Sequence, residues 1–493
     1  MNPIEIYLGL AVFALTALLG IYTLQRRNLD LVSLFALFFG SYLGLAPLLS
    51  FFAGNRTFPF PSNALFLTYA SFFIFILALF AAKLFFETLR KEPNRNPNFT
   101  TDSLTFIISS VTKIPFILVV SIFVIVVALR LEAFASGGGI SGLHDLEYSL
   151  SRNYLIVVIS HLASPLTSIL YFYCFATFLQ KKQSLYKIAV IMLPVLLIFS
   201  FLSGRREFLM PFLLFLLCAL ALKPKIQWRY IIGGLAFVAF FFSVISPIFL
   251  SMRSAAQTER HIQVDGSSLD LLRHSIEEVR AQDRFDQEDR SRANIAARLL
   301  MFRSVPMQLF TAQELRPPML GRAFFQASTS ALPRFLRPFE AWYNPQTFVQ
   351  ENYNLPVHDV SYSVLSQFIA DFGIFGAVLG GVFLGLFFKI GTALSVRYVN
   401  RYPIPLFALF FSLAEMAFSP EINPAVLFNL PRNVILLSIL YFFYKRVTKT
   451  FANSLVSDEP FIKPITNIQE TSLIRHKFPL NRENPRISHR SIG

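Results

Sequence analysis

The chain has 493 residues, of which 54% are hydrophobic and only 15% are charged. A soluble domain carries roughly 25% charged residues, so this composition excludes a protein built mainly of water-soluble domains and indicates a lipid environment. The net charge of +15 does not indicate a nucleic-acid partner, because the basic clusters lie between apolar runs, as orienting charges do in membrane proteins. The two cysteines, Cys174 and Cys218, are too few for a disulfide framework or a cysteine metal site.

Apolar runs that are long enough to cross a bilayer recur along the chain, since about twenty helical residues span a hydrocarbon core of ~30 Å. We therefore predict an all-α polytopic membrane protein with about 11 transmembrane helices, eight in residues 1–252 and three in residues 362–445. We predict that residues 253–361 form one large extracytoplasmic (periplasmic) loop and that residues 446–493 form a cytoplasmic tail, which we expect to be poorly ordered. The predicted spans are 4–24, 31–52, 64–86, 110–130, 154–180, 185–203, 206–222, 230–252, 367–392, 404–420 and 433–444.

Basic residues occur in every second short loop, which predicts that these loops and the C-terminus are cytoplasmic and that the N-terminus is outside. The pair Arg205 and Arg206 departs from this rule, because it falls on the outer side in a tight turn before the seventh span. Lys83 and Lys113 lie close enough to span ends for their ammonium groups to reach the interface, so we assign them no role.

The large loop contains thirteen arginines and no lysine. Arginine differs from lysine because its planar guanidinium binds phosphate and carboxylate groups in a bidentate manner. In the first half of the loop the arginines alternate with acidic residues, so we predict amphipathic helices with a solvated charged surface. The second half has few acids, and Pro333 and Pro338 bracket Arg334 and Arg337, which favours an anion site. Seven prolines between 306 and 356 predict that this half lacks regular helix.

A polar stripe begins the ninth predicted span. Ser363, Gln367 and Asp371 follow at helical spacing, shortly after His358. Because a carboxylate at membrane depth is costly, the stripe has to face protein, water or a ligand, and a packed helix interface and a functional site both satisfy this condition. The glycines behind it predict close helix packing; they are Gly376, Gly380, Gly381 and Gly385. Two further ionisable residues within predicted spans, His161 and Glu415, are either proton carriers or hydrogen-bonded groups.

Three segments together resemble the Wzy-type polymerases of O-antigen and other oligosaccharide repeat units. They are Ser203-Gly204-Arg205-Arg206-Glu207, Leu332-Pro333-Arg334, and Ser361-Tyr362-Ser363 leading into Asp371-Phe372-Gly373-Ile374-Phe375-Gly376. The predicted order of spans and loops resembles the family over most of the chain, whereas recognisable motifs cover only a small part of it. In the last motif the family carries a Glu or Asn farther upstream, where this chain has Gln367 and Asp371, so the identity of a carboxylate base stays open.

The resemblance implies a metal-independent, membrane-embedded glycosyltransferase of the bacterial inner membrane that needs no cofactor. Its substrates would be undecaprenyl-pyrophosphate-linked oligosaccharides, polymerised into O-antigen, capsular or exopolysaccharide chains. Arg205, Arg206, Arg334 and Arg337 would bind the pyrophosphate, and either His358 or Asp371 would be the general base. Besides membrane lipid, a chain-length regulator and a flippase are the partners that such an enzyme would have.

Three alternatives remain open at this stage. An O-antigen ligase would use the same chemistry with a lipid A core as acceptor. A flippase or transporter of lipid-linked glycans would often show internal repeats and ionisable groups near the membrane midplane, and the sequence shows no repeat. A non-catalytic scaffold of an envelope complex would tolerate replacement of its arginines.

Overall fold

The computed structural model describes about three fifths of the chain, and every regular element in that part is helical. The described residues are 3–25, 30–52, 61–89, 99–135, 162–180, 183–203, 205–222, 233, 236, 303–330, 332, 345–355, 363–419 and 424–457. Among them, five helices are long and apolar enough to cross a membrane, or six if one bent pair counts as a single span. The chain therefore has the architecture of a helical membrane protein, while the predicted number of spans stays a prediction.

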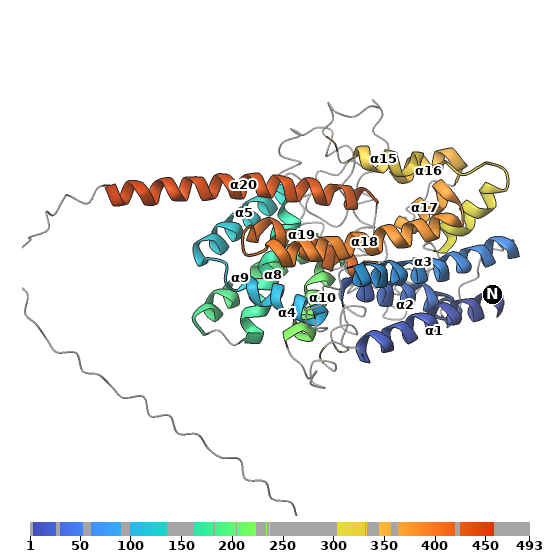
Figure 1. Ribbon diagram of the computed structural model, residues 1–493, viewed down its shortest axis with the longest axis horizontal. Helices are drawn as coiled ribbons and strands as arrows, with labels where there is room; N and C mark the ends of the chain where they lie inside the picture. The colour runs from blue at the N-terminus through green and yellow to red at the C-terminus, as the bar shows by residue number, and fades with distance from the viewer. Residues whose placement is uncertain are drawn as a thin grey trace, which may run out of the picture. The chain divides into compact units, whose positions relative to one another are not determined.

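Figure 1 shows the helices, which follow one another without an intervening strand in the described part. In chain order they are α1 (Pro3–Gln25), α2 (Leu31–Phe52), α3 (Ser62–Leu89), α4 (Phe99–Val111), α5 (Phe116–Ala135), α8 (Ala163–Gln180), α9 (Gln183–Ser203), α10 (Arg205–Leu222), α15 (Arg322–Ser330), α16 (Pro345–Tyr353), α17 (Val364–Phe372), α18 (Phe375–Tyr398), α19 (Pro403–Ala417) and α20 (Pro424–Ser457). Residues 303–313 form a further helix. The chain divides into two units after Phe442. In the second unit, the described residues are those of α20, which ends at Ser457.

Helix α18 packs along α3, and the two run in the same direction (Figure 1). A Cβ atom added at Gly381 would lie 2.5 Å from the carbonyl oxygen of Phe75, and one added at Gly385 would lie 2.9 Å from the Cβ of Ala82. Backbones this close leave no room for a side chain, which is the packing that small residues permit in membranes. The prediction of close packing from the glycine spacing is thereby confirmed at these two positions.

Helices α1 and α2 join this pair as an antiparallel hairpin. Gly9 of α1 faces Gly44 of α2, and Gly20 faces Leu37, so the end of one helix meets the start of the other. The aromatic ring of Phe35 on α2 contacts those of Phe75 and Phe388 on α3 and α18. The group α1–α2–α3–α18 therefore has one end at Glu5 and another at Asp30, and these names are used for the two ends below.

A second group of helices surrounds α8, which is buried over most of its length. The ring of Phe172 stacks on that of Phe411 in α19 with centroids 3.7 Å apart, and the hydroxyl of Tyr171 lies 2.7 Å from that of Ser200 in α9. Glu415 of α19 accepts a hydrogen bond from Ser168, which is one of the two arrangements expected for it. His161 lies outside the described residues.

Two of the predicted spans are broken in the structure. The span predicted at 110–130 lies mostly on α5 and includes only the last two residues of α4. The apolar parts of α4 and α5 meet at 87°, because Pro115 precedes α5 and cannot donate the hydrogen bond that a continuous helix needs there. The span predicted at 367–392 is divided into α17 and α18 by Gly373, which has a positive φ of 59°. Residues 230–252 lie almost entirely outside the description.

The prediction that prolines exclude helix from the second half of the large loop is wrong. Residues 303–313, α15 and α16 are helical there. Pro345 begins α16, where a proline is tolerated, and Pro317 and Pro318 lie between the helical residues 303–313 and α15. The amphipathic helices predicted for 253–302 fall outside the described residues, and α20 extends to Ser457, beyond the predicted end of the last span.

Gly381→Leu tests the packing of α18 on α3. The new side chain would have to displace the backbone of Phe75, so we expect a loss of roughly 1–3 kcal/mol, the usual cost of overpacking a core. The loss would be measured by unfolding in mixed detergent micelles. Val378→Leu, at an exposed position of the same helix, serves as the matched control and should change little. Equal stability of the two variants would contradict the packing.

Candidate functional site

The predicted polar stripe lies on α17 and faces protein. Ser363 caps the helix by accepting a hydrogen bond of 3.1 Å from the N–H of Ser366, while Gln367 and Asp371 follow one and two turns later. All three stripe residues are buried. The sequence left protein, water or a ligand as possible surroundings for this stripe, and the structure shows that it faces protein.

Asp371 connects α17 to the start of α15. Its Oδ1 accepts a hydrogen bond of 2.9 Å from the N–H of Ala323, and its Oδ2 accepts one of 2.7 Å from Phe324. These N–H groups belong to the first turn of α15. The N–H groups of a first turn have no acceptor inside their own helix, and they attract negative charge. Both carboxylate oxygens are thus engaged in holding α15, so the geometry favours a positioning role for Asp371.

The surroundings of Asp371 also affect its proton affinity. It lies before the apolar span that begins at Phe375. Burial raises the pKa of this carboxyl, and the N–H groups of Ala323, Phe324 and Gly321 oppose that rise. A raised pKa suits a general base that works near neutral pH, so the role of Asp371 as the base stays a prediction beside its positioning role.

The C-terminal carbonyl groups of α17 bind segments of the large loop. The amide of Gln313 donates to the carbonyl of Ile369 at 2.7 Å, and the hydroxyl of Tyr353 donates to that of Ala370 at 2.8 Å. The N–H of Leu320 donates to the carbonyl of Asp371 at 2.8 Å. Because α17 ends at Phe372, the carbonyls of Ala370 and Asp371 have no partner within the helix, while that of Ile369 also accepts the N–H of Gly373 at 2.8 Å. The break at Gly373 thus leaves the carbonyls of Ala370 and Asp371 available to the loop.

Gln367 lies in the middle of this arrangement without a partner among the described residues. Its side chain is 0% exposed, and neither its amide nitrogen nor its amide oxygen forms a hydrogen bond there. A buried amide without partners costs free energy comparable to that of lost hydrogen bonds. The position therefore requires polar groups from a ligand, from water or from the remaining chain.

A buried ion pair joins the large loop to the Glu5 end of the helix group. The guanidinium of Arg303, within the helical residues 303–313, pairs with the carboxylate of Glu5 on α1. The hydroxyl of Tyr69 on α3 donates to the same carboxylate at 3.5 Å. All three side chains are buried. Arg303 thus has an acidic partner that is remote in sequence, and its charge is neutralised inside the protein.

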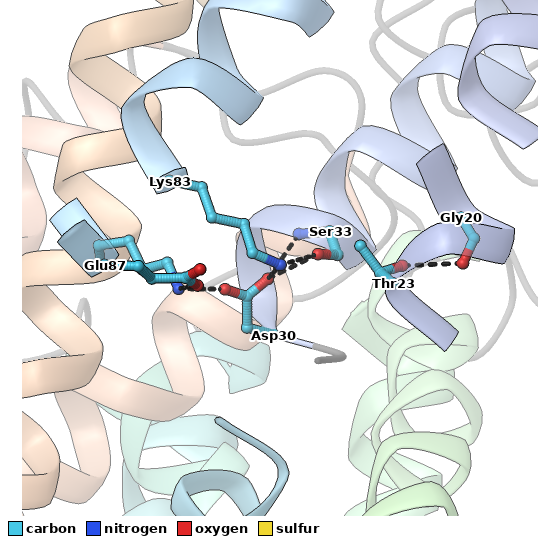
Figure 2. A network of polar contacts seen from close by, with 7 residues as sticks. Gly20, Thr23, Asp30, Ser33, Lys83 and Glu87 are labelled. Atoms are coloured by element: carbon cyan, nitrogen blue, oxygen red, sulfur yellow. Dashed lines mark hydrogen bonds and ion pairs between the residues drawn. The ribbon is translucent and has the colours of Figure 1, made fainter. Parts of the chain in front are cut away.

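A second buried network lies at the opposite, Asp30 end, where Figure 2 shows the ammonium group of Lys83 directed at Asp30 and Ser33. The Nζ of Lys83 is 3.1 Å from Oδ1 of Asp30 and 2.7 Å from the hydroxyl of Ser33. The Nζ of Lys389 bridges Oδ2 of Asp30 at 2.5 Å and Oε1 of Glu87 at 2.6 Å. Two cations and two anions therefore link α2, α3 and α18.

This network corrects the interpretation of Lys83 as an interfacial lysine, because its side chain is only 2% exposed. Asp30 precedes the apolar part of α2. Burial by itself would raise the pKa of Asp30, but the ammonium groups of Lys389 and Lys83 outweigh burial and hold the pKa well below its usual range. The carboxylate is therefore ionised throughout the physiological range, and the network is charged and closed.

Of the residues predicted to form the site, Asp371 is the one whose side-chain contacts the structure describes. Arg205 and Arg206 begin α10, as predicted for a turn that opens a span, and only their backbone is described. Arg334, Arg337 and His358 lie outside the described residues. The structure therefore does not show whether these residues come together, and their roles stay predictions.

Sequence reasoning missed Glu5, Asp30 and Lys389. A carboxylate at the edge of an apolar run and a lysine within a glycine-rich one were visible signals of buried charge, but their partners lie on other helices. Among the described residues, no group of three or more His, Cys, Asp or Glu side chains is placed to hold a metal ion.

Lys389→Met tests the network at the Asp30 end. Removing this cation leaves Asp30 and Glu87 with Lys83 as their remaining nearby ammonium group, so we expect a loss of about 3–5 kcal/mol, typical of breaking a buried pair. Unfolding in mixed micelles measures the loss. Lys113→Met, which removes an exposed lysine, is the control. If both variants lose the same stability, the network contributes nothing specific.

Asp371→Ala tests the attachment of α15. The N–H groups of Ala323 and Phe324 would lose their acceptor, and we expect a cost of about 1–3 kcal/mol together with faster hydrogen exchange in residues 322–330. Asp371→Asn keeps one acceptor oxygen, so its stability and exchange rates should fall between those of the parent chain and of Asp371→Ala. Ser328→Ala on α15 controls for changes within that helix. Unchanged exchange in both Asp371 variants would refute the attachment.

Comparison with known proteins does not assign a family to the chain, so a functional assignment has to rest on the geometry. No protein-family model, curated protein or solved structure matches the chain. What the described residues establish is a helical membrane architecture with buried charge networks at both ends of one helix group. The chain is identified at this level as a multi-span membrane protein.

Proposed function

We propose that the chain is a membrane-embedded glycosyltransferase that polymerises oligosaccharide repeat units carried on undecaprenyl pyrophosphate. The observation that carries the proposal is the attachment of α15 to Asp371 at the break between α17 and α18. Helix α15 ends at Ser330, three residues before the segment in which Pro333 and Pro338 bracket two arginines. These arginines therefore follow directly from a fixed element.

The position of this fixed element fits a lipid-linked substrate. The apolar span of α18 begins at Phe375, four residues after Asp371. The pyrophosphate of a polyprenyl carrier lies at the boundary between lipid and water, where such a span begins. A cationic segment that starts near this boundary is suited to bind the pyrophosphate while the prenyl chain stays in the bilayer.

In the proposed reaction, the hydroxyl oxygen of the acceptor sugar attacks the anomeric carbon of the donor glycan. A new glycosidic bond forms, the bond from that carbon to the pyrophosphate oxygen breaks, and the pyrophosphate leaves with the electron pair. Arg205, Arg206, Arg334 and Arg337 would stabilise the charge on the leaving group. His358 or Asp371 would accept the proton of the attacking hydroxyl.

The described contacts refine these roles. Both oxygens of Asp371 hold α15, which favours His358 as the base and Asp371 as a positioning residue. Arg303 is neutralised by Glu5, so it is not available for an anionic substrate. The unpartnered amide of Gln367 is suited to a sugar hydroxyl, which can donate and accept at once.

A transporter of lipid-linked glycans is the second candidate, and two observations favour it. The apolar helices α4 and α5 meet at 87°, and discontinuous helices often form the substrate sites of transporters. A network of three buried charges and the partly exposed Glu87 lies among apolar helices. This network, however, is closed on itself, and no substrate is needed to satisfy it.

Alanine substitutions at the predicted site test the enzyme directly. In a host that lacks its own copy, Arg205→Ala, Arg206→Ala, Arg334→Ala, Arg337→Ala and His358→Ala should each leave single repeat units on the cell surface in place of a ladder of chain lengths. The reason is that repeat units still reach the acceptor but are not joined. Gel electrophoresis of the surface polysaccharide, with immunoblots for protein level, measures this.

Arg397→Ala is the matched control, because Arg397 is exposed in the last turn of α18, at the opposite end of that span. It should keep a normal ladder. Loss of all surface glycan, single units included, would support the transporter instead. A normal ladder from all five variants would remove the proposed site.

A further inference from the structure

The segment 314–321 of the large loop exposes leucines although it is firmly held. Leu315 is 90% exposed and Leu320 is 79% exposed. Between them, Met319 is buried, and its N–H donates to the carbonyl of Ala370 at 3.1 Å. The N–H of Leu320 donates to the carbonyl of Asp371 at 2.8 Å. The segment is therefore fixed by its backbone while two large apolar side chains point away from the protein.

Leu320 also has an unfavourable backbone conformation. Its φ is 51°, in the left-handed region that disfavours a branched side chain, and Gly321 beside it has a φ of 90°. A leucine in this region is strained, because its Cβ lies too close to the backbone carbonyl oxygen. Glycine would adopt the same conformation without this strain. The side chain is thus kept at a position where the fold alone would favour glycine.

The segment lies at the level where a membrane span begins. A Cβ atom added at Gly373 would lie 3.9 Å from Pro318, and one added at Gly321 would lie 3.6 Å from the ring of Phe372. Two residues after Gly373 begins the span Phe375–Tyr398. Its first residue is 74% exposed, and the exposed apolar surface continues along α18 through Val378 and Leu379. The segment therefore lies beside the exposed apolar start of a candidate membrane span.

Charged residues beside the leucines fit the headgroup region of a bilayer. Arg316 and Arg322 are exposed on either side of Leu320, with Glu314 as the acidic residue of the same segment. Cationic side chains that flank apolar ones at the end of a span are typical of the interface, where they meet lipid phosphates. With Arg322, which follows the segment, two arginines stand against Glu314, and this single net positive charge matches an anionic lipid surface.

We propose that segment 314–321 inserts Leu315 and Leu320 into the leaflet at the Glu5 end of the helix group, with Arg316 and Arg322 among the lipid headgroups. The partner is the lipid surface itself, not a second protein. Since α15 begins at Arg322, this insertion sets the height of α15 above the bilayer. The proposal stands apart from the glycosyltransferase activity, because it needs no substrate.

Fluorescence quenching in lipid nanodiscs tests the insertion. Leu315→Cys and Leu320→Cys are labelled singly with a nitrobenzoxadiazole dye, and the parent chain, whose two cysteines are buried, gives the background. The nanodiscs contain phosphatidylcholine, phosphatidylglycerol and a lipid with a doxyl group on its acyl chain. We expect doxyl lipid to quench both labels and aqueous iodide to leave them bright. Glu351→Cys, exposed on α16, is the control and should show the reverse.

The other outcomes overturn the proposal. Iodide quenching at both leucine positions would place the segment in water. Shielding from both quenchers would show that protein, and not lipid, covers it. Leu320→Gly provides a folding control, because it removes the backbone strain: it should melt at or above the temperature of the parent chain, while doxyl quenching of a label at position 315 becomes weaker. Unchanged quenching in this variant would show that Leu320 does not hold the segment in the leaflet.

Discussion

Polar groups that lie among apolar helices have to find their partners within the protein, because a bilayer offers no hydrogen bonds. This constraint organises the helix group α1–α2–α3–α18 at both ends. At one end Glu5 takes its partner from the large loop through Arg303, and at the other Asp30 takes two lysines from α3 and α18. The close approach of α18 to α3 at Gly381 and Gly385 brings those lysines within reach of the same carboxylate.

The same constraint explains how the large loop is held. The break at Gly373 ends α17 early and leaves the carbonyl groups of Ala370 and Asp371 without partners in their own helix. Gln313, Leu320 and Tyr353 supply donors from three parts of the loop, and Asp371 supplies the acceptor for a fourth, α15. The loop is therefore assembled on the end of a membrane helix, which links its position to the bilayer through α18.

This arrangement gives the proposed chemistry and the proposed lipid contact a common origin. A lipid-linked pyrophosphate lies at the depth of the headgroups, and a protein that acts on it has to control the height of its cationic residues. In the proposed mechanism, the anchored start of α15 and the strained, exposed leucine before it would both serve that control. The closed network at the Asp30 end is remote from this chemistry and stabilises the helices on which the loop depends.

Sequence patterns predicted the helical elements well wherever a continuous apolar run decides the structure, as in α1, α2, α3 and α9. They predicted that Ser363, Gln367 and Asp371 share one face of a helix for the same reason, since spacing along one helix is local. They left open whether that face meets protein, water or a ligand. They failed where a single residue interrupts a helix, as at Pro115 and Gly373, because both residues also occur within transmembrane helices. The helices between the prolines of the large loop were missed because a proline at a first turn does not prevent a helix.

The sequence by itself determined that the chain is a helical membrane protein, because hydrophobic length and charge frequency are properties of each segment alone. Only the tertiary structure decided which charges are partners. Lys83 looked like an interfacial lysine until Asp30 and Ser33 were found beside it, and Arg303 looked free of acids until Glu5 was found against it. An ion pair between helices depends on which faces pack together, and that is settled by close contacts such as those at Gly381, which join residues far apart in the chain.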